Sequence, residues 1–146
     1  MPPTNLEEQL VRDEGEVLHA YQDSEGYTTV GVGTCIDPRA GCGITREESR
    51  YLLNNRIQIA GNAIRIYLPW VLPVLETKDP VRFAALVNMV FNMGIEHLLQ
   101  FKNFLEALRA GDYKTAAAEM LDSLWARQVG ERAKRLALQM ETGNWV

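Results

Sequence analysis

Two carboxylates and a threonine near the start of the chain carry the clearest indication of chemistry. Glu14 stands before Gly15 at an expected helix end, Asp23 begins a turn, and Thr29 follows on a glycine-rich strand. Carboxylates in different backbone environments can hold different protonation states, as acid–base cleavage of a glycosidic bond requires. The usual role of a single acidic residue is a solvated surface charge, and the spacing of these three positions alone leaves that role the more frequent one, with acid–base catalysis as the alternative.

Two longer segments extend this pattern. The first reads DEG from residue 13, YQD from residue 21 and GYTTVGVG from residue 26, and the second reads AALVNMVFNMG over residues 84–94. Both resemble the phage-type lysozymes, the endolysin-like muramidases of the T-even phage lysozyme family. The resemblance covers nearly the whole chain and is thinnest from Cys35 to about Leu75.

The resemblance implies a role for each of the three residues. Glu14 matches the proton donor of the family, and Asp23 and Thr29 match the residues that complete its catalytic site. Glu14 would protonate the leaving oxygen, while ionised Asp23 directs a water or stabilises an oxocarbenium-like transition state. The family favours inversion, which needs carboxyl groups roughly 6.5–9.5 Å apart, against about 5 Å for retention. The sequence leaves both outcomes open.

The resemblance also marks positions for substrate binding. Phe91 and Asn92 match residues that line the family's cleft, Gln128 falls in an expected loop facing it, and Arg132 matches an arginine beside the catalytic glutamate. A neighbouring guanidinium would favour the charged form of Glu14 and oppose its role as an acid. From the residues alone, Phe91 would more often be core and Arg132 part of a solvated helix face. The expected substrate-binding set is Tyr21, Gly33, Cys35, Phe91, Asn92, Gln128 and Arg132.

Four positions at the expected cleft rim depart from the family pattern. A histidine often follows the family's glycine-rich strand, whereas this chain has Thr34 there and Cys35 at the next, usually apolar position. Phe104 and Glu119 stand where the T-even phage enzyme has small or neutral polar residues. The expected chemistry is therefore kept while the sugar-binding rim changes, which leaves the preferred substrate open.

Short elements must position the candidate catalytic residues. A helix from about Leu6 should end at Gly15, because its apolar residues follow a helical spacing and glycine ends helices readily. The β-rich stretches at residues 17–21 and 27–32, separated by a turn, predict a hairpin. Residues 37–43 predict a loop.

The remainder of the chain predicts helices. Thr45 and Glu48 form a capping box at the start of a long helix, expected to run from Arg46 to Leu68. Asp79, followed by proline, starts a nearly all-apolar helix that should end at Gly94 and occupy the centre of a bundle. Further helical segments are expected at residues 69–75, 104–110, 113–125 and 131–141.

These elements together predict an α+β, lysozyme-like fold with one catalytic domain over residues 1–146. A small antiparallel sheet lobe of about residues 15–59 should be joined by the long helix to a helical lobe of about residues 60–146. We expect the first helix to pack on the helical lobe. A hinge between the lobes would let the cleft open for a polymer.

Composition argues against several classes of protein. The chain has 146 residues, 47% hydrophobic and 23% charged, which is typical of a globular domain that needs no metal ion or disulfide to hold its core. Its net charge of −4, with ten acidic and five basic groups in residues 1–60, argues against nucleic-acid binding. No apolar run is long enough to span a membrane, and the N-terminus lacks the features of a secretory signal peptide.

The two cysteines, Cys35 and Cys42, share one glycine-containing loop. Free thiols are the expected state in a chain made in the cytosol, and a disulfide formed after release is the alternative. Such a bridge would add about 2.5 kcal/mol in the chain-entropy model. Zinc is not expected, because there is no second cysteine pair and both His19 and His97 lie far off in sequence.

The expected partner is bacterial peptidoglycan, cleaved without a cofactor by a monomer that has no stable membrane association. We expect synthesis in the cytoplasm of a host bacterium and release to the wall by a separate membrane factor. The leading activity is hydrolysis of the β-1,4 bond between N-acetylmuramic acid and N-acetylglucosamine for host cell lysis.

Three other functions remain open at this stage. Asp23 and Thr29 argue against a lytic transglycosylase, which directs no water. Glu14 argues against an inactive peptidoglycan-binding module, which the altered rim weakly favours. The acidic charge argues against a helical DNA-binding regulator.

Overall fold

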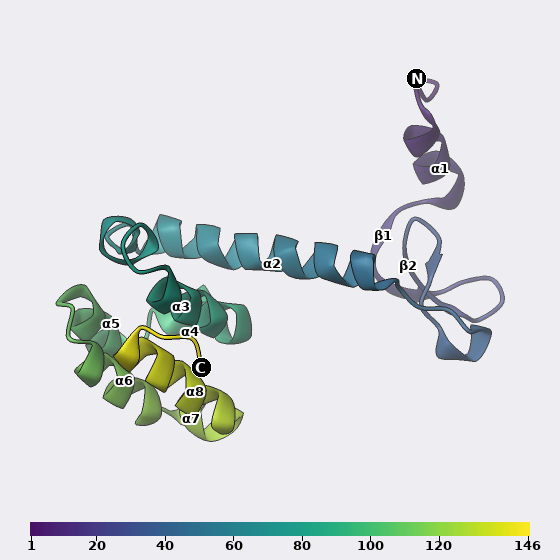
Figure 1. The fold of residues 1–146 in the computed structure, drawn as a ribbon. Helices are drawn as coiled ribbons and strands as arrows, with labels where there is room; N and C mark the ends of the chain where they lie inside the picture. The colour runs from purple at the N-terminus through teal and green to yellow at the C-terminus, as the bar shows by residue number, and fades with distance from the viewer. The chain divides into compact units, whose positions relative to one another are not determined.

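The computed structural model describes residues 1–146, which form two compact units (Figure 1). Residues 1–51 are called the sheet unit here, and residues 52–146 the helical unit. The fold is α+β, as predicted, with many helices and one three-stranded antiparallel sheet. No helix combines the length and the apolar character that crossing a membrane would require.

The sheet unit begins with α1, Leu6–Glu14, and both ends of this helix have clear causes. The Asn5 side chain caps it by accepting a hydrogen bond from the Glu8 amide. Gly15 ends it as predicted, with a φ of 76° that residues with a side chain rarely adopt.

Three strands follow in the order β1-β2-β3, confirming the predicted hairpin and adding a short third strand. They are β1 (Val17–Gln22), β2 (Thr28–Gly31) and β3 (Thr34–Cys35). The register places Thr29 opposite Tyr21 on one side and opposite Cys35 on the other. Residues opposite each other in an antiparallel sheet point to the same face, so one row of side chains crosses all three strands.

An ion pair between the buried Asp37 and the largely exposed Arg39 holds the segment after the sheet. The Asp37 carboxylate is 2% exposed and accepts hydrogen bonds from the Arg39 guanidinium, the Arg39 amide and the Thr28 amide. The guanidinium and then the Thr28 amide hold the pKa of Asp37 well below its usual range. The predicted loop therefore contains a 3-10 turn, η1 (Pro38–Ala40), which Asp37 caps.

The prediction of free thiols was wrong, because Cys35 and Cys42 form a disulfide with Cα atoms 5.5 Å apart. The turn at η1 reverses the chain, and the Cys42 amide donates to the Asp37 carbonyl. This places the two cysteines within bridging distance, which their separation in sequence alone does not specify.

The long helix α2 runs from Arg46 to Tyr67. Its predicted capping box is confirmed, since the Glu48 amide donates to Thr45 Oγ1 at 3.1 Å and the Thr45 amide donates to Glu48 Oε1 at 2.9 Å. The helix ends one residue before the predicted Leu68, because Pro69 disfavours helical backbone at the residue before it.

The hydrophobic core lies in the helical unit. The apolar helix expected after Asp79 is α3 (Pro80–Met93), on which Ala85, Leu86, Val87, Met89 and Val90 are buried. The last helix, α8, packs against α3, α6 and α7. The elements after α2 are η2 (Leu72–Glu76), α3 (Pro80–Met93), α4 (Ile95–Leu98), α5 (Lys102–Arg109), α6 (Tyr113–Leu121), α7 (Leu124–Val129) and α8 (Glu131–Thr142).

Three predictions for the helical unit need correction. The single helix expected over residues 113–125 is divided into α6 and α7, because the Ser123 hydroxyl caps a new helix by accepting from the Ala126 amide. Gln128 consequently lies in α7 rather than in a loop. Phe104, expected at the cleft rim, is 1% exposed and belongs to the core.

Acid should weaken the Asp37 interaction. Because the folded-state pKa of Asp37 is lowered, its stabilisation is complete above the unfolded-state pKa of about 4 and is lost as pH falls towards the folded-state value. We expect the melting temperature to drop more steeply below about pH 4 in the unchanged protein than in Asp37→Asn. Thermal unfolding followed by circular dichroism from pH 7 to pH 2 measures this difference, and equal slopes would contradict it.

The disulfide should be dispensable for folding. Asp37 and its partners hold the same loop, and the bridge closes a short segment, so its loss should cost no more than about 2.5 kcal/mol. We expect the protein to stay folded and active after reduction. Melting temperature and lytic rate with and without reductant test this, and collapse of the fold on reduction would show the bridge to be essential.

Candidate active site

Glu14 and Gly33 lie against each other at the junction of α1 and the sheet. A Cβ atom on Gly33 would stand 3.0 Å from Glu14 Oε2, so the missing side chain makes room for the carboxylate. Gly33 also has a φ of 68°, which favours glycine for a second reason. Glu14 itself is exposed, and its carboxylate accepts no hydrogen bond within the sheet unit.

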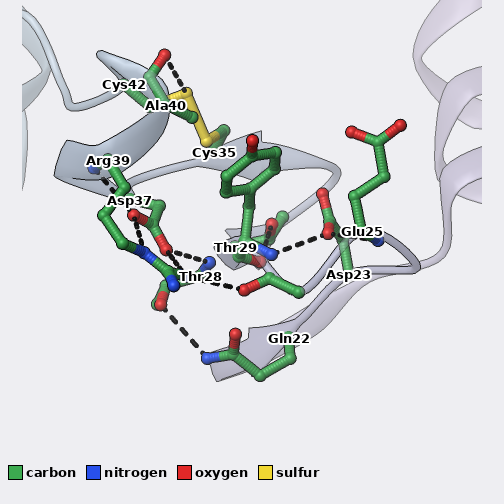
Figure 2. Close-up of polar contacts among 12 residues, drawn as sticks. Gln22, Asp23, Glu25, Thr28, Thr29, Cys35, Asp37, Arg39, Ala40 and Cys42 are labelled. Carbon is green, nitrogen blue, oxygen red and sulfur yellow. Dashed lines mark hydrogen bonds and ion pairs between the residues drawn. A yellow bond between two sulfur atoms is a disulfide. The ribbon is translucent and has the colours of Figure 1, made fainter.

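Asp23 is fixed by the turn that it begins. Its Oδ1 atom accepts hydrogen bonds from the amides of Glu25 at 2.9 Å and Tyr27 at 2.8 Å (Figure 2). The second oxygen, Oδ2, has no partner within the sheet unit. One half of this half-buried carboxylate is thus held by the backbone, while the other half is free to accept a proton or a water hydrogen.

Thr29 is joined to the same turn through the backbone of Tyr27. Its side chain is 3% exposed, and Oγ1 donates to the Tyr27 carbonyl at 3.1 Å. That carbonyl also accepts the Asp23 amide at 2.9 Å. Tyr27 therefore positions both Asp23 and Thr29 with main-chain groups, a role that its side-chain type did not signal.

The row across the sheet brings three of the expected residues together. Tyr21, Thr29 and Cys35 stand opposite one another on β1, β2 and β3. Cys35 enters this row as half of a disulfide, so it offers a bonded sulfur rather than a thiol.

The helical unit holds the other expected residues, in two grooves. Phe91 is 44% exposed, so the core role that its surroundings in the sequence favoured is wrong. It lines an apolar groove with Arg132, whose Nε and Nη2 atoms donate to Asn88 Oδ1 at 3.0 Å and 2.6 Å. The expected contact between Arg132 and Glu14 joins residues of different units and stays a prediction.

Asn92 and Gln128 line the second groove of the helical unit. Trp125 lines the same groove and donates from Nε1 to Asn92 Oδ1 at 2.7 Å, which fixes the orientation of the Asn92 amide. The sequence analysis did not single out Trp125, because a tryptophan on an amphipathic helix looks like any other core residue.

These groups can carry acid–base chemistry. Glu14 is open to solvent, and Asp23 keeps one carboxylate oxygen without a hydrogen bond. The Thr29 hydroxyl donates a hydrogen bond to the Tyr27 carbonyl, and its oxygen can still accept one. A proton donor and an acceptor for water are the groups that glycoside hydrolysis needs. No cluster of three or more His, Cys, Asp and Glu side chains has the arrangement of a metal site.

Comparison with known proteins gives consistent matches. The family model described as phage lysozyme matches residues 11–140. Probable T4-type lysozyme 1 of Dictyostelium discoideum is 30% identical, over 96% of this chain and 95% of that protein. The endolysin of Salmonella phage P22 is 32% identical, over 81% of this chain and 78% of that protein.

A further relative is the pre-baseplate central spike protein Gp5 of Enterobacteria phage T4, which is 32% identical over 98% of this chain but only 28% of its own length. The residues matched by the family model include both candidate carboxylates and every other residue of the expected site. The fold has the small antiparallel sheet and the helices expected of a lysozyme. The chain therefore belongs to the phage lysozyme family, which implies peptidoglycan hydrolysis.

Proposed function

We propose that this protein is a muramidase that hydrolyses the β-1,4 bond between N-acetylmuramic acid and N-acetylglucosamine in bacterial peptidoglycan. The observation that carries the proposal is that one small unit holds two carboxylates in different settings, Glu14 without a hydrogen-bond partner and Asp23 fixed by two amides. Similarity to a T4-type lysozyme and to a phage endolysin supports it.

In the proposed reaction, Glu14 gives its proton to the glycosidic oxygen as the bond to the anomeric carbon breaks. A water held by Asp23 Oδ2 and Thr29 Oγ1 attacks that carbon and passes a proton to Asp23. The hydrogen bonds on Asp23 Oδ1 support this role, because a carboxylate held on one side presents its other oxygen in one direction. The anomeric configuration would be inverted.

The sugars would be bound by residues of both units. We propose Tyr21, Gly33 and Cys35 from the sheet unit, and we propose Phe91, Asn92, Gln128 and Arg132 from the helical unit. The exposed Phe91 ring and the Asn92 amide support this, since sugar sites combine an apolar surface with oriented polar groups.

We also propose that the protein has two lobes and that α1 packs on the helical lobe. Within its own unit α1 buries none of its side chains, although Leu6, Leu10 and Val11 give it an apolar face. A helix of this length is marginal in water without such packing.

The proposed biological role is lysis of a host bacterium, with synthesis in the host cytoplasm and release by a separate membrane factor. Peptidoglycan would be the partner, and the protein would act as a monomer without a cofactor. Similarity to the P22 endolysin supports this role.

Hydrolysis and its dependence on Glu14 can be tested together. Incubation with purified peptidoglycan should release fragments with free reducing ends, whereas anhydro-sugars would indicate a transglycosylase and no product would indicate a binding module. Glu14→Gln should fold normally and lose nearly all lytic activity, because an amide cannot donate the proton.

Glu16→Gln is the matched control, because this exposed neighbour of the same type accepts no hydrogen bond and should keep full activity. Substantial lysis by pure Glu14→Gln protein would rule out Glu14 as the acid.

Asp23→Asn should reduce kcat about a hundredfold while changing KM little, because the lost charge acts mainly in the transition state. The asparagine Oδ1 can still accept from the Glu25 and Tyr27 amides, so the turn should survive. Initial rates on a soluble peptidoglycan oligosaccharide give both constants.

Glu25→Gln, in the same turn, is the control, since Glu25 contributes only its backbone amide to the Asp23 carboxylate. A kcat of Asp23→Asn within a few-fold of the unchanged protein would contradict the role of Asp23.

A further inference from the structure

We propose that the ion pair between the buried Asp37 and the largely exposed Arg39 is a positioning pair for the candidate active site, holding the segment that orients Asp23 and Thr29. The inference rests on the proposed function and deepens it, because neither residue belongs to the expected site. It concerns only the sheet unit, in which all the groups involved lie.

The Asp37 carboxylate is buried and accepts four hydrogen bonds. Its Oδ1 atom accepts from the Arg39 amide at 2.9 Å and from Arg39 Nε at 3.0 Å, and its Oδ2 atom accepts from Arg39 Nη2 at 2.7 Å and from the Thr28 amide at 3.0 Å. Only Asp37 and Thr29 are buried among residues 1–51. The sheet unit thus has two polar side chains where a larger unit would have an apolar core.

The Arg39 guanidinium extends the contact to the Asp23 turn. The same Nη2 atom donates to the Gly26 carbonyl at 2.8 Å, and the guanidinium carbon lies 5.8 Å from the centre of the Tyr27 ring. Figure 2 shows Asp37 and Arg39 on one side of this segment and Asp23 on the other. The arginine therefore joins the loop after the sheet to the turn before β2.

Asp37 and Arg39 hold the two residues that flank Tyr27 in the chain. Gly26 is held through its carbonyl by Arg39, and Thr28 is held through its amide by Asp37. Between them, the Tyr27 amide donates to Asp23 Oδ1 and the Tyr27 carbonyl accepts from Thr29 Oγ1. A shift of residues 26–28 would therefore move Asp23 and Thr29 together.

Loss of the Asp37 charge should therefore act on the reaction as well as on stability. In Asp37→Asn the side-chain NH2 replaces one acceptor with a donor, so the guanidinium loses one of its two hydrogen bonds, and either the Arg39 amide or the Thr28 amide also loses its acceptor. Small displacements of positioned groups cost catalysis far more than they cost binding. The disulfide, which closes the same loop, makes no hydrogen bond to residues 23–29, so its reduction should leave the segment in place.

The experiment measures kcat and KM on a soluble peptidoglycan oligosaccharide for Asp37→Asn and Arg39→Lys, together with hydrogen exchange of the Tyr27 amide by NMR. We expect kcat to fall at least about tenfold in Asp37→Asn, with KM within about twofold. The Tyr27 amide should exchange faster than in the unchanged protein.

Arg39→Lys keeps the fold testable if Asp37→Asn unfolds, because the Arg39 side chain is largely exposed. A lysine keeps the charge but lacks the planar guanidinium that donates hydrogen bonds to both Asp37 and the Gly26 carbonyl. We expect an intermediate loss of kcat and an intermediate rise in exchange.

Asp79→Asn is the matched control. Asp79 also accepts from an arginine side chain and from a backbone amide, both of Arg82, but it caps α3 in the helical unit. At a temperature where each variant is folded, Asp79→Asn should lower the melting temperature without changing kcat or the exchange of Tyr27.

Unchanged kcat together with unchanged Tyr27 exchange in both sheet-unit variants would overturn the inference, and so would an equal loss of kcat in Asp79→Asn. An unchanged protein without activity on peptidoglycan would instead refute the proposed function. In that case faster Tyr27 exchange would still support the ion pair as the anchor of the Asp23 turn, and unchanged exchange would overturn it.

Discussion

The sheet unit depends on hydrogen bonds to the backbone around Tyr27, because it buries no apolar side chain of its own. Small units without an apolar core normally need another restraint on the chain. Here two carboxylates supply it from opposite sides, Asp23 at the Tyr27 amide and Asp37 at the Thr28 amide. The disulfide then limits how far the loop carrying Asp37 can move. Hydrogen bonds, rather than apolar packing, therefore set the positions of Asp23 and Thr29.

Much of the fold could be predicted because its signals are local. Gly15 ends the first helix and Thr45 with Glu48 caps α2 through contacts within a few residues, which a sequence displays directly. The division at Ser123 was missed, because the same hydroxyl can face solvent in a continuous helix or cap a new one. The disulfide was also missed, since the reversal of the chain at η1 depends on the contact of Asp37 with a strand nine residues earlier.

Parts of the candidate site could also be predicted from the sequence, and other parts could not. Glu14, Asp23 and Thr29 stood out through spacing and family resemblance, yet their surroundings are made by groups that carry no side-chain signal. The Tyr27 main chain is one such group, and the space above Gly33 is another. Phe104 shows the opposite error, because a position expected at the cleft rim carries a large apolar side chain that is buried in the core.

Three carboxylates of the sheet unit differ in how many hydrogen bonds their oxygens accept. Asp37 has both oxygens bound and a lowered pKa, so protonation would break charge-assisted hydrogen bonds. Asp23 has one oxygen bound by two amides, which leaves the other oxygen for a water. Glu14 is exposed and has neither oxygen hydrogen-bonded within the unit. The number of hydrogen bonds that each carboxylate accepts agrees with its proposed role: none for Glu14 as the proton donor, two for Asp23 as the base, and four for Asp37 as the anchor.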